Sequence, residues 1–134
     1  MKQIIVDTHH RLEEGLKSTF DYIEPHTVEI IAIRPYLENI SVESQVQAAL
    51  DQFESGEQIL VFTDLLGGSV NQTFAKFLDS YNIELIAGVN LPVLMTLALA
   101  ICGGDVGETT IRQALEDSRQ QIVYVNDMLQ EQAM

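Results

Sequence analysis

The chain has 134 residues, 46% of them apolar, which describes a folded domain with a sizeable core and excludes a disordered chain. Its 7 basic and 20 acidic side chains give a net charge of −13, which argues against nucleic acid as a partner because the phosphates would be repelled. No apolar run approaches the roughly 20 residues that cross a bilayer, and the polar start "MKQIIVDTHH" does not fit a signal peptide. We therefore expect a cytoplasmic protein without direct membrane insertion.

Strand-like and helix-like segments alternate along the chain. Short apolar, β-branched runs predict buried strands at 3–6, 28–33, 59–62 and 83–87. The predicted helices are one with Leu12, Leu16, Phe20 and Ile23 on one face, one capped by Ser41 and ended by Gly56, one from Ser69 to about residue 78, and two at 93–101 and 109–119. This order predicts an α/β fold, a three-layer sandwich with an open, mostly parallel four-stranded sheet and helices on both faces. No linker or repeat interrupts it, so residues 1–134 are expected to form a single domain.

The C-terminal segment departs from this regular order. The run "QIVYV" at 121–125 predicts a short fifth strand after a mostly polar helix, and the residues beyond it resemble a frayed tail. Because this strand comes last, we expect it either at an edge of the sheet or paired with another copy of the chain.

Polar residues follow three of the predicted strands. The sequence "DTHH" follows the first strand, "TDLLGGS" the third and "GVNLP" the fourth. Binding sites of open parallel sheets lie at the edge where the strands end. The fold is therefore expected to gather His9 or His10, Asp64, Gly67, Gly68, Ser69 and Asn90 at one rim.

These residue types suit phosphoryl transfer. A histidine ring offers one nitrogen as a nucleophile when the other keeps its proton, and a carboxylate such as Asp64 holds that proton in place. The "GGS" segment at a helix start offers free backbone N–H groups to an anion. The sequence has no Walker-type lysine loop, so nothing in it supports direct use of ATP.

Each of these residues also has a plainer interpretation. The two histidines fit exposed loop residues, Asp64 fits a turn cap, and Asn90 fits a turn residue before "LP". Ser69 and Gln72 fit the S-x-x-Q pattern of a capping box. Metal binding by the histidines and Asp64 is a third option, but adjacent histidines point apart on a strand and no further ligand is evident. We therefore expect neither a metal nor a cofactor.

The segments "THHRLEEGLKS", "TDLLGGSVNQ" and "GVNLPVL" stand in the order and spacing of three known motifs. They resemble "HG…GL", "TDLxGGSPxN" and "GVNLPML" of the IIA component of the mannose family of the bacterial phosphoenolpyruvate-dependent sugar phosphotransferase system (PTS). The resemblance covers residues 2 to about 125. In that family the reactive histidine lies six residues before the glycine of "GL", here Gly15, which implies that His9 is the reactive residue. It also implies that Asp64 is the carboxylate beside it and that Gly67, Gly68 and Ser69 form the phosphate-binding turn.

The resemblance further implies a reaction and its partners. His9 would take a phosphoryl group from the phosphocarrier protein HPr and pass it to a histidine of a separate IIB polypeptide, as a phosphotransferase of kinase type. IIB then phosphorylates a sugar that enters through the membrane components IIC and IID. No metal is needed, because donor and acceptor are both imidazoles. Family members are commonly homodimers in which the C-terminal strand crosses to the partner's sheet, and the strand at 121–125 fits such an antiparallel exchange.

Several positions depart from the family's pattern. His10 stands where the family most often has glycine or another small residue, and it places a second titratable ring at the rim. Val70 replaces the usual proline, and Leu66 stands where many members have an aromatic residue. Residues 71–73 replace a more apolar set, so the residue-by-residue assignment stops at Ser69.

Two other functions fit the same residues. The phosphocarrier subunit of dihydroxyacetone kinase has a related fold, but its motif after the third strand lacks "GGS". A phosphorylation-dependent regulatory binding module would act through a partner protein, since the chain has no DNA-binding segment.

Overall fold

The computed structural model describes residues 1–34 and 39–133, and strands alternate with helices over most of this length. The elements are β1 (Lys2–Asp7), α1 (Leu12–Ile23), β2 (Val28–Ile33), α2 (Val42–Leu50), β3 (Ile59–Thr63), α3 (Ser69–Ala75), β4 (Ile83–Ile86), α4 (Leu91–Ile101), α5 (Glu108–Arg119) and α6 (Val125–Ala133). None of the helices in the described ranges has the length and apolar character needed to span a membrane.

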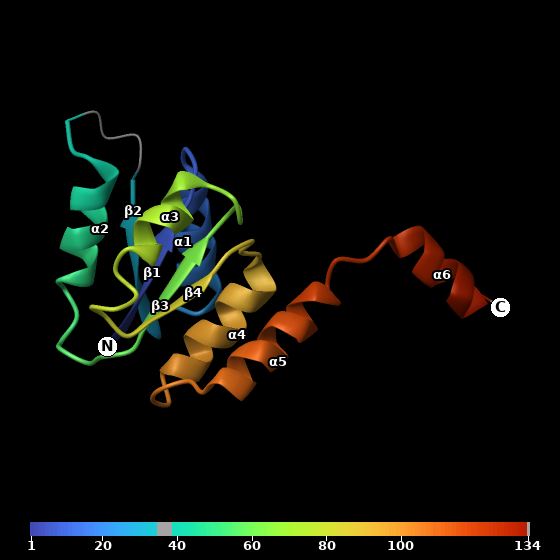
Figure 1. Ribbon diagram of the computed structural model, residues 1–134. Helices are drawn as coiled ribbons and strands as arrows, with labels where there is room; N and C mark the ends of the chain where they lie inside the picture. The colour runs from blue at the N-terminus through green and yellow to red at the C-terminus, as the bar shows by residue number, and fades with distance from the viewer. Residues whose placement is uncertain (35–38, 134) are drawn as a thin grey trace.

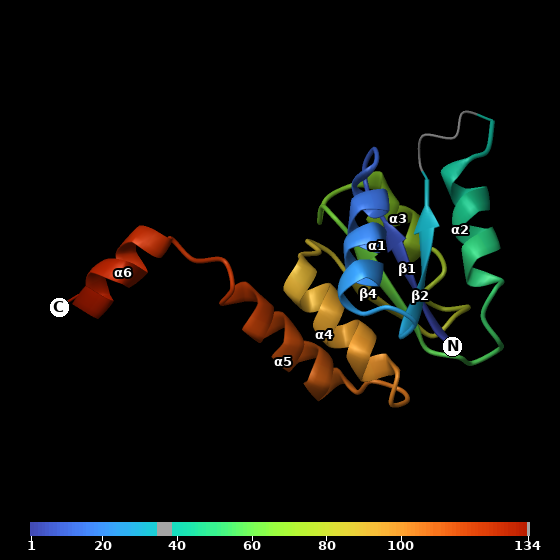
Figure 2. The ribbon, with the colours of Figure 1, turned by 180° about the vertical axis from the view of Figure 1, so that it is seen from behind.

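The four strands form one sheet in the order β2-β1-β3-β4, and all neighbouring pairs are parallel. Figures 1 and 2 show helices on both sides of this sheet. The predicted three-layer α/β fold is therefore confirmed. The strands read as nearly continuous apolar runs because both of their faces are covered by helices.

The sheet separates two apolar cores. Successive residues of a strand point to opposite faces, so Ile4 and Val6 of β1 lie in one core and Ile5 lies in the other. The first core contains residues of α1, α4 and α5, whereas the second contains residues of α2 and α3. Burial on both faces fixes the register of β1, and the loop that follows β1 starts from a defined point.

The predicted Ser41 cap is confirmed, whereas two helices end earlier than predicted. The Ser41 hydroxyl accepts a hydrogen bond from the Ser44 N–H at 3.1 Å and caps α2. That helix ends at Leu50, well before Gly56. The helix that begins at Ser69 ends at Ala75 and continues as turns, because the N–H groups of the next residues bond three residues back.

The C-terminal segment corrects the sequence-based prediction. Residues 121–125 form no strand, and α6 begins at Val125 and covers the residues that were expected to be a frayed tail. Figure 1 shows this segment leaving the end of α5 and pointing away from the sheet. A strand needs a neighbouring strand for its backbone N–H and C=O groups, and this path offers none within the chain. The fifth strand is thus wrong for the single chain, and its pairing with a second copy stays a prediction.

Candidate functional site

The loops after β1 and β3 meet at one edge of the sheet. Asp7, the last residue of β1, pairs with Thr63, the last residue of β3. The backbone N–H of His9 donates to Asp64 Oδ2 at 2.9 Å, and His9 Nδ1 lies 3.0 Å from both Asp64 oxygens. The two loops are thus joined by His9 and Asp64, the pair that the family resemblance implied.

This contact fixes which nitrogen of the neutral His9 ring carries the hydrogen. A carboxylate accepts hydrogen bonds and does not donate them, so the hydrogen in this contact belongs to Nδ1. Nε2 of the neutral ring then carries the lone pair. The His9 side chain is 53% exposed, whereas that of Asp64 is only 12% exposed. The site therefore presents an accessible nucleophilic nitrogen, which is held from behind by a largely shielded carboxylate.

Two opposing effects act on the pKa of Asp64. Burial raises this pKa. The hydrogen bonds from the His9 backbone N–H and ring, together with the charge of that ring, lower it by more than burial raises it. The net result is a pKa below the usual 3.8. Asp64 is therefore ionised at neutral pH and remains an acceptor for the Nδ1 proton.

The glycine turn after β3 lies against the His9 ring. A Cβ atom at Gly68 would lie 3.5 Å from His9 Cε1 and 4.0 Å from His9 Nε2. Gly68 is the N-cap of α3, and Ser69 is its first residue, without a side-chain cap hydrogen bond. The capping-box interpretation of Ser69 and Gln72 is therefore wrong. The start of α3 instead places backbone next to the exposed ring nitrogen.

Asn71 is a structural residue of the site that sequence reasoning missed. Its amide nitrogen donates to the carbonyl oxygens of Leu65 and Leu66 at 2.7 and 2.6 Å, and its Oδ1 accepts from the Thr63 hydroxyl at 2.7 Å. These bonds tie both sides of the loop that carries Asp64 to α3. The available signal was an amide residue eight positions after a buried strand-end threonine, and the family motif does not feature it.

His10 and Asn90, the two remaining rim residues, are placed differently from His9. His10 is exposed and adopts φ 52°, a left-handed conformation that glycine takes more readily than other residues. Asn90 caps α4 by accepting from the Val93 N–H at 2.9 Å, and its amide nitrogen donates to the Ser118 carbonyl at 3.3 Å. Asn90 therefore serves to position α4 and α5, which is more than the turn residue that its sequence context suggested.

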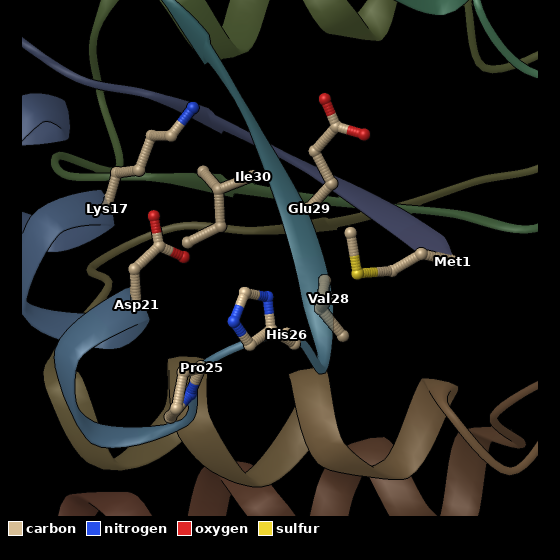
Figure 3. Close-up of a pocket in the computed structure, with 8 residues that line it drawn as sticks. All are labelled: Met1, Lys17, Asp21, Pro25, His26, Val28, Glu29 and Ile30. Carbon is tan, nitrogen blue, oxygen red and sulfur yellow. The ribbon is translucent and has the colours of Figure 1, made fainter.

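The third histidine lies elsewhere. His26 belongs to the α1–β2 loop, which precedes β2, and parallel strands place that loop at the edge opposite the end of β1. Figure 3 shows it in a pocket of about 300 Å³, lined by Met1, Lys17, Asp21, Pro25, His26, Val28, Glu29 and Ile30. This pocket is separate from the His9–Asp64 pair.

Two fully buried acidic residues also belong to the neighbourhood of His9. Asp7 precedes His9 by two residues, and Glu13 lies in the first turn of α1. Burial, then the charges of Asp64 and Glu13, raise the pKa of Asp7 to about 7, against a smaller lowering by His9. Sequence analysis missed both residues, because an acidic residue after an apolar strand usually marks the start of an exposed loop. Over the described ranges, no group of three or more histidine, cysteine or acidic side chains is arranged to hold a metal ion.

Comparison with known proteins places the chain in a family. Residues 3–115 match the EIIA-man family, PTS system fructose IIA component. None of the curated proteins matches the chain significantly.

Three solved structures share the fold over nearly their whole length. One, described as a phosphoenolpyruvate-dependent sugar PTS permease of Klebsiella pneumoniae, is 30% identical with a TM-score of 0.84, covering 96% of this chain and 95% of that one. The PTS component EIIA of Streptococcus agalactiae is 25% identical with a TM-score of 0.74, covering 95% of this chain and 99% of the other. A PTS IIA protein associated with the fucose utilization operon of Streptococcus pneumoniae, 20% identical with a TM-score of 0.76 and covering 96% and 97%, shares the fold alone. The chain belongs to the EIIA-man family of IIA components of the sugar phosphotransferase system.

Proposed function

We propose that this chain carries a phosphoryl group on His9, taking it from phospho-HPr and delivering it to a separate IIB component during sugar uptake. The observation that supports this most strongly is the contact between His9 Nδ1 and both oxygens of Asp64 at 3.0 Å. Asp64 leaves Nε2 as the one ring nitrogen with a free lone pair, on a half-exposed side chain.

The reaction is an exchange of one P–N bond for another. The lone pair of His9 Nε2 attacks phosphorus, the bond between phosphorus and the donor imidazole breaks, and the donor ring keeps the electron pair. The Nδ1 proton stays on His9, where Asp64 stabilises the positive charge that develops on the ring. The reverse exchange with a histidine of IIB empties the site again. Both steps leave the redox state unchanged, and neither needs a metal ion or a cofactor.

Gly67, Gly68 and Ser69 are the proposed phosphate-binding turn. The phosphoryl group on Nε2 would lie beside this turn, because the Gly68 Cα bears no side chain that would fill the space next to Nε2. The absence of a side-chain cap on α3 leaves the backbone N–H groups of its first turn for phosphate oxygens. His10 and Asn90 remain at the rim without a proposed chemical step.

HPr and IIB would dock in turn on this edge of the sheet, and IIC and IID would be reached only through IIB. Leu65 and Leu66 are exposed beside Asp64, Leu66 by 81%, and offer an apolar contact next to His9. The net charge of −13 favours partners that present basic residues around their own reactive histidine. These roles fit a single IIA domain over residues 1–134 that works in the cytoplasm.

A homodimer is part of this proposal. The C-terminal arm, defined as residues 122–133, exposes Ile122, Val123, Tyr124, Val125, Met128 and Leu129. α6 has no buried residue, and β4 forms an edge of the sheet at which all side chains but that of Ile86 are half-buried. A strand formed by residues 122–124 of a second copy would cover such an edge and bury apolar surface of the arm.

Phosphotransfer to single-residue variants tests the proposal. Wild type, His9→Ala, His10→Ala and Asp64→Ala are incubated with Enzyme I, HPr and labelled phosphoenolpyruvate, followed by a IIB protein. We expect acid-labile label on wild type and His10→Ala, none on His9→Ala, and weak label on Asp64→Ala. Label on His9→Ala would overturn the assignment. Label that passes to a dihydroxyacetone kinase subunit but to no IIB, or that only controls binding of a regulator, would favour the alternative functions.

A further inference from the structure

Two fully buried carboxyl groups lie close behind the His9–Asp64 pair. Asp7 is the last residue of β1, and neither of its side-chain oxygens has a hydrogen-bond partner. Glu13 Oε2 accepts a hydrogen bond from the Thr8 hydroxyl at 3.1 Å, whereas Glu13 Oε1 has no partner. Such buried, unpartnered oxygens are rare in folded proteins and call for a physical reason.

The backbone places Asp7 at the centre of the site's charges. Asp7 pairs with Thr63, the residue before Asp64, and precedes His9 by two positions. The carboxylates of Asp64 and Glu13 repel a negative charge on Asp7, and the His9 ring attracts it. Asp7 thus responds to the charge that the reactive histidine carries.

The remaining elements around Asp7 add little charge of their own. On the β2 side Asp7 pairs with Ile33, which the exposed Arg34 follows. Helix α3 carries no charged side chain. At the start of α1, His10, Arg11 and Glu14 have interactions of their own. The charges that act most strongly on Asp7 are therefore those of Asp64, Glu13 and His9.

Phosphorylation changes this local charge. A phosphoryl group carries about −1.5 to −2 charges near neutral pH. Burial, followed by the neighbouring carboxylates, already raises the pKa of Asp7 to about 7, so Asp7 is poised between its two protonation states. A further negative charge nearby makes the ionised form of Asp7 less favourable and the protonated form more so.

We propose that Asp7 is a positioning residue for phosphoryl transfer, a buried acid that takes up a proton when His9 is phosphorylated and releases it when the phosphoryl group leaves. This inference rests on the proposed function of His9. The proton comes from solvent and returns to it, and the P–N bonds break and form as described above. Protonation of Asp7 removes a buried negative charge that would repel the phosphoryl group.

The pH dependence of the transfer equilibrium tests this coupling. The equilibrium between phospho-HPr and the full chain is measured from pH 6 to pH 9 for wild type, Asp7→Asn and Asp79→Asn. Asn has the size of a protonated Asp and does not titrate, and Asp79 is an exposed matched control between α3 and β4. Titration of HPr contributes equally to all three proteins and cancels in the ratios of their equilibrium constants.

A clear signature is expected above pH 7. The wild-type equilibrium constant should fall relative to that of Asp7→Asn by about three- to tenfold per pH unit, because uptake of one full proton gives tenfold. Asp79→Asn should follow wild type. Glu13→Gln, which keeps the bond to Thr8, should move the onset of the fall to lower pH. A wild-type to Asp7→Asn ratio that is constant from pH 6 to pH 9 would overturn this inference alone, whereas a wild type that accepts no phosphate would overturn the proposed function as well.

A second measurement needs no variant. The side-chain carboxyl carbon of Asp7 is followed by NMR against pH in wild type, with and without phosphate on His9. We expect a midpoint near 7 in the unphosphorylated protein and a higher midpoint in the phosphorylated one. A midpoint below 5 in both forms, or the same midpoint in both, would overturn the inference.

Discussion

The edge of the sheet around His9 and the C-terminal arm differ in whether their side chains have partners within the chain. At the edge, the groups of His9, Asp64 and Asn71 are bonded within the chain, over separations of up to 55 residues. In the arm, α6 buries nothing and Tyr124 is 67% exposed. The groups of the site thus find their partners within one chain, whereas the exposed apolar side chains of the arm would find theirs in the proposed dimer. The family match, which ends at residue 115, stops before the arm begins.

The largest expected effect is the loss of the proposed dimer when the C-terminal arm is altered. Ile122→Asp places a charge on a side chain that is 79% exposed in the single chain and, in the proposed dimer, buried. We expect wild type to sediment at twice the chain mass of 15.0 kDa and Ile122→Asp to sediment at that mass. Ile40→Asp changes an exposed residue two positions before α2, and α2 lies across the molecule from α6 in Figure 1, so this variant should remain dimeric. A wild type that sediments as a monomer would contradict the dimer.

The next largest effect is the dependence of folding stability on pH that Asp7 causes. The pKa of Asp7 is about 7 in the folded protein and 3.8 ordinarily, so the folded state binds the proton more tightly and stability falls as pH rises from about 4 through 7. Above about pH 7, ionised Asp7 lowers the free energy of unfolding by roughly 4 kcal/mol. Asp7→Asn should therefore be more stable than wild type at pH 8, by up to this amount, and similar near pH 4. Urea unfolding at both pH values measures the difference, and a less stable variant at pH 8 would refute the argument.

Substitution of Asn71 tests whether the loop of Asp64 depends on the Asn71 hydrogen bonds. Asn71→Ala leaves the fully buried Thr63 hydroxyl without its acceptor and two loop carbonyls without their donor. We expect a loss of about 1–3 kcal/mol in the free energy of unfolding, with slower phosphorylation because Asp64 is less well held. Gln72→Ala, at the exposed neighbouring position, should change both by little. Equal stability and equal phosphorylation rates of the two variants would show that the Asn71 hydrogen bonds are dispensable.

The smallest expected effect is a difference in stability between two variants at His10. Its left-handed backbone, with φ 52°, penalises a Cβ atom, so His10→Gly should exceed His10→Ala in stability by roughly 1 kcal/mol. Thermal unfolding of both variants measures this difference. Both should still accept phosphate, which would separate the backbone role of position 10 from the chemistry of His9. A more stable alanine variant would show that the conformation is different in solution.

The same comparison explains what the sequence could predict. Strands such as 59–62, nearly all apolar, and the Ser41 cap are local signals, and the topology rule then brings His9 and Asp64 to one edge. Asn71 and Asp7 were missed because their roles depend on which distant groups they meet, and apolar periodicity carries no information about that. The arm was misread because "QIVYV" has strand propensity, but a strand also needs a partner edge that lies outside this path of the chain.

The role of His9 is tested most directly by the position of the phosphate on the phosphorylated protein. NMR of the ¹⁵N-labelled histidine rings, with coupling to ³¹P, reads this position without a variant. We expect phosphate on Nε2 of His9, with the Nδ1 proton retained and bonded to Asp64. Phosphate on His10, or on Nδ1 of His9 with the Asp64 contact broken, would contradict it.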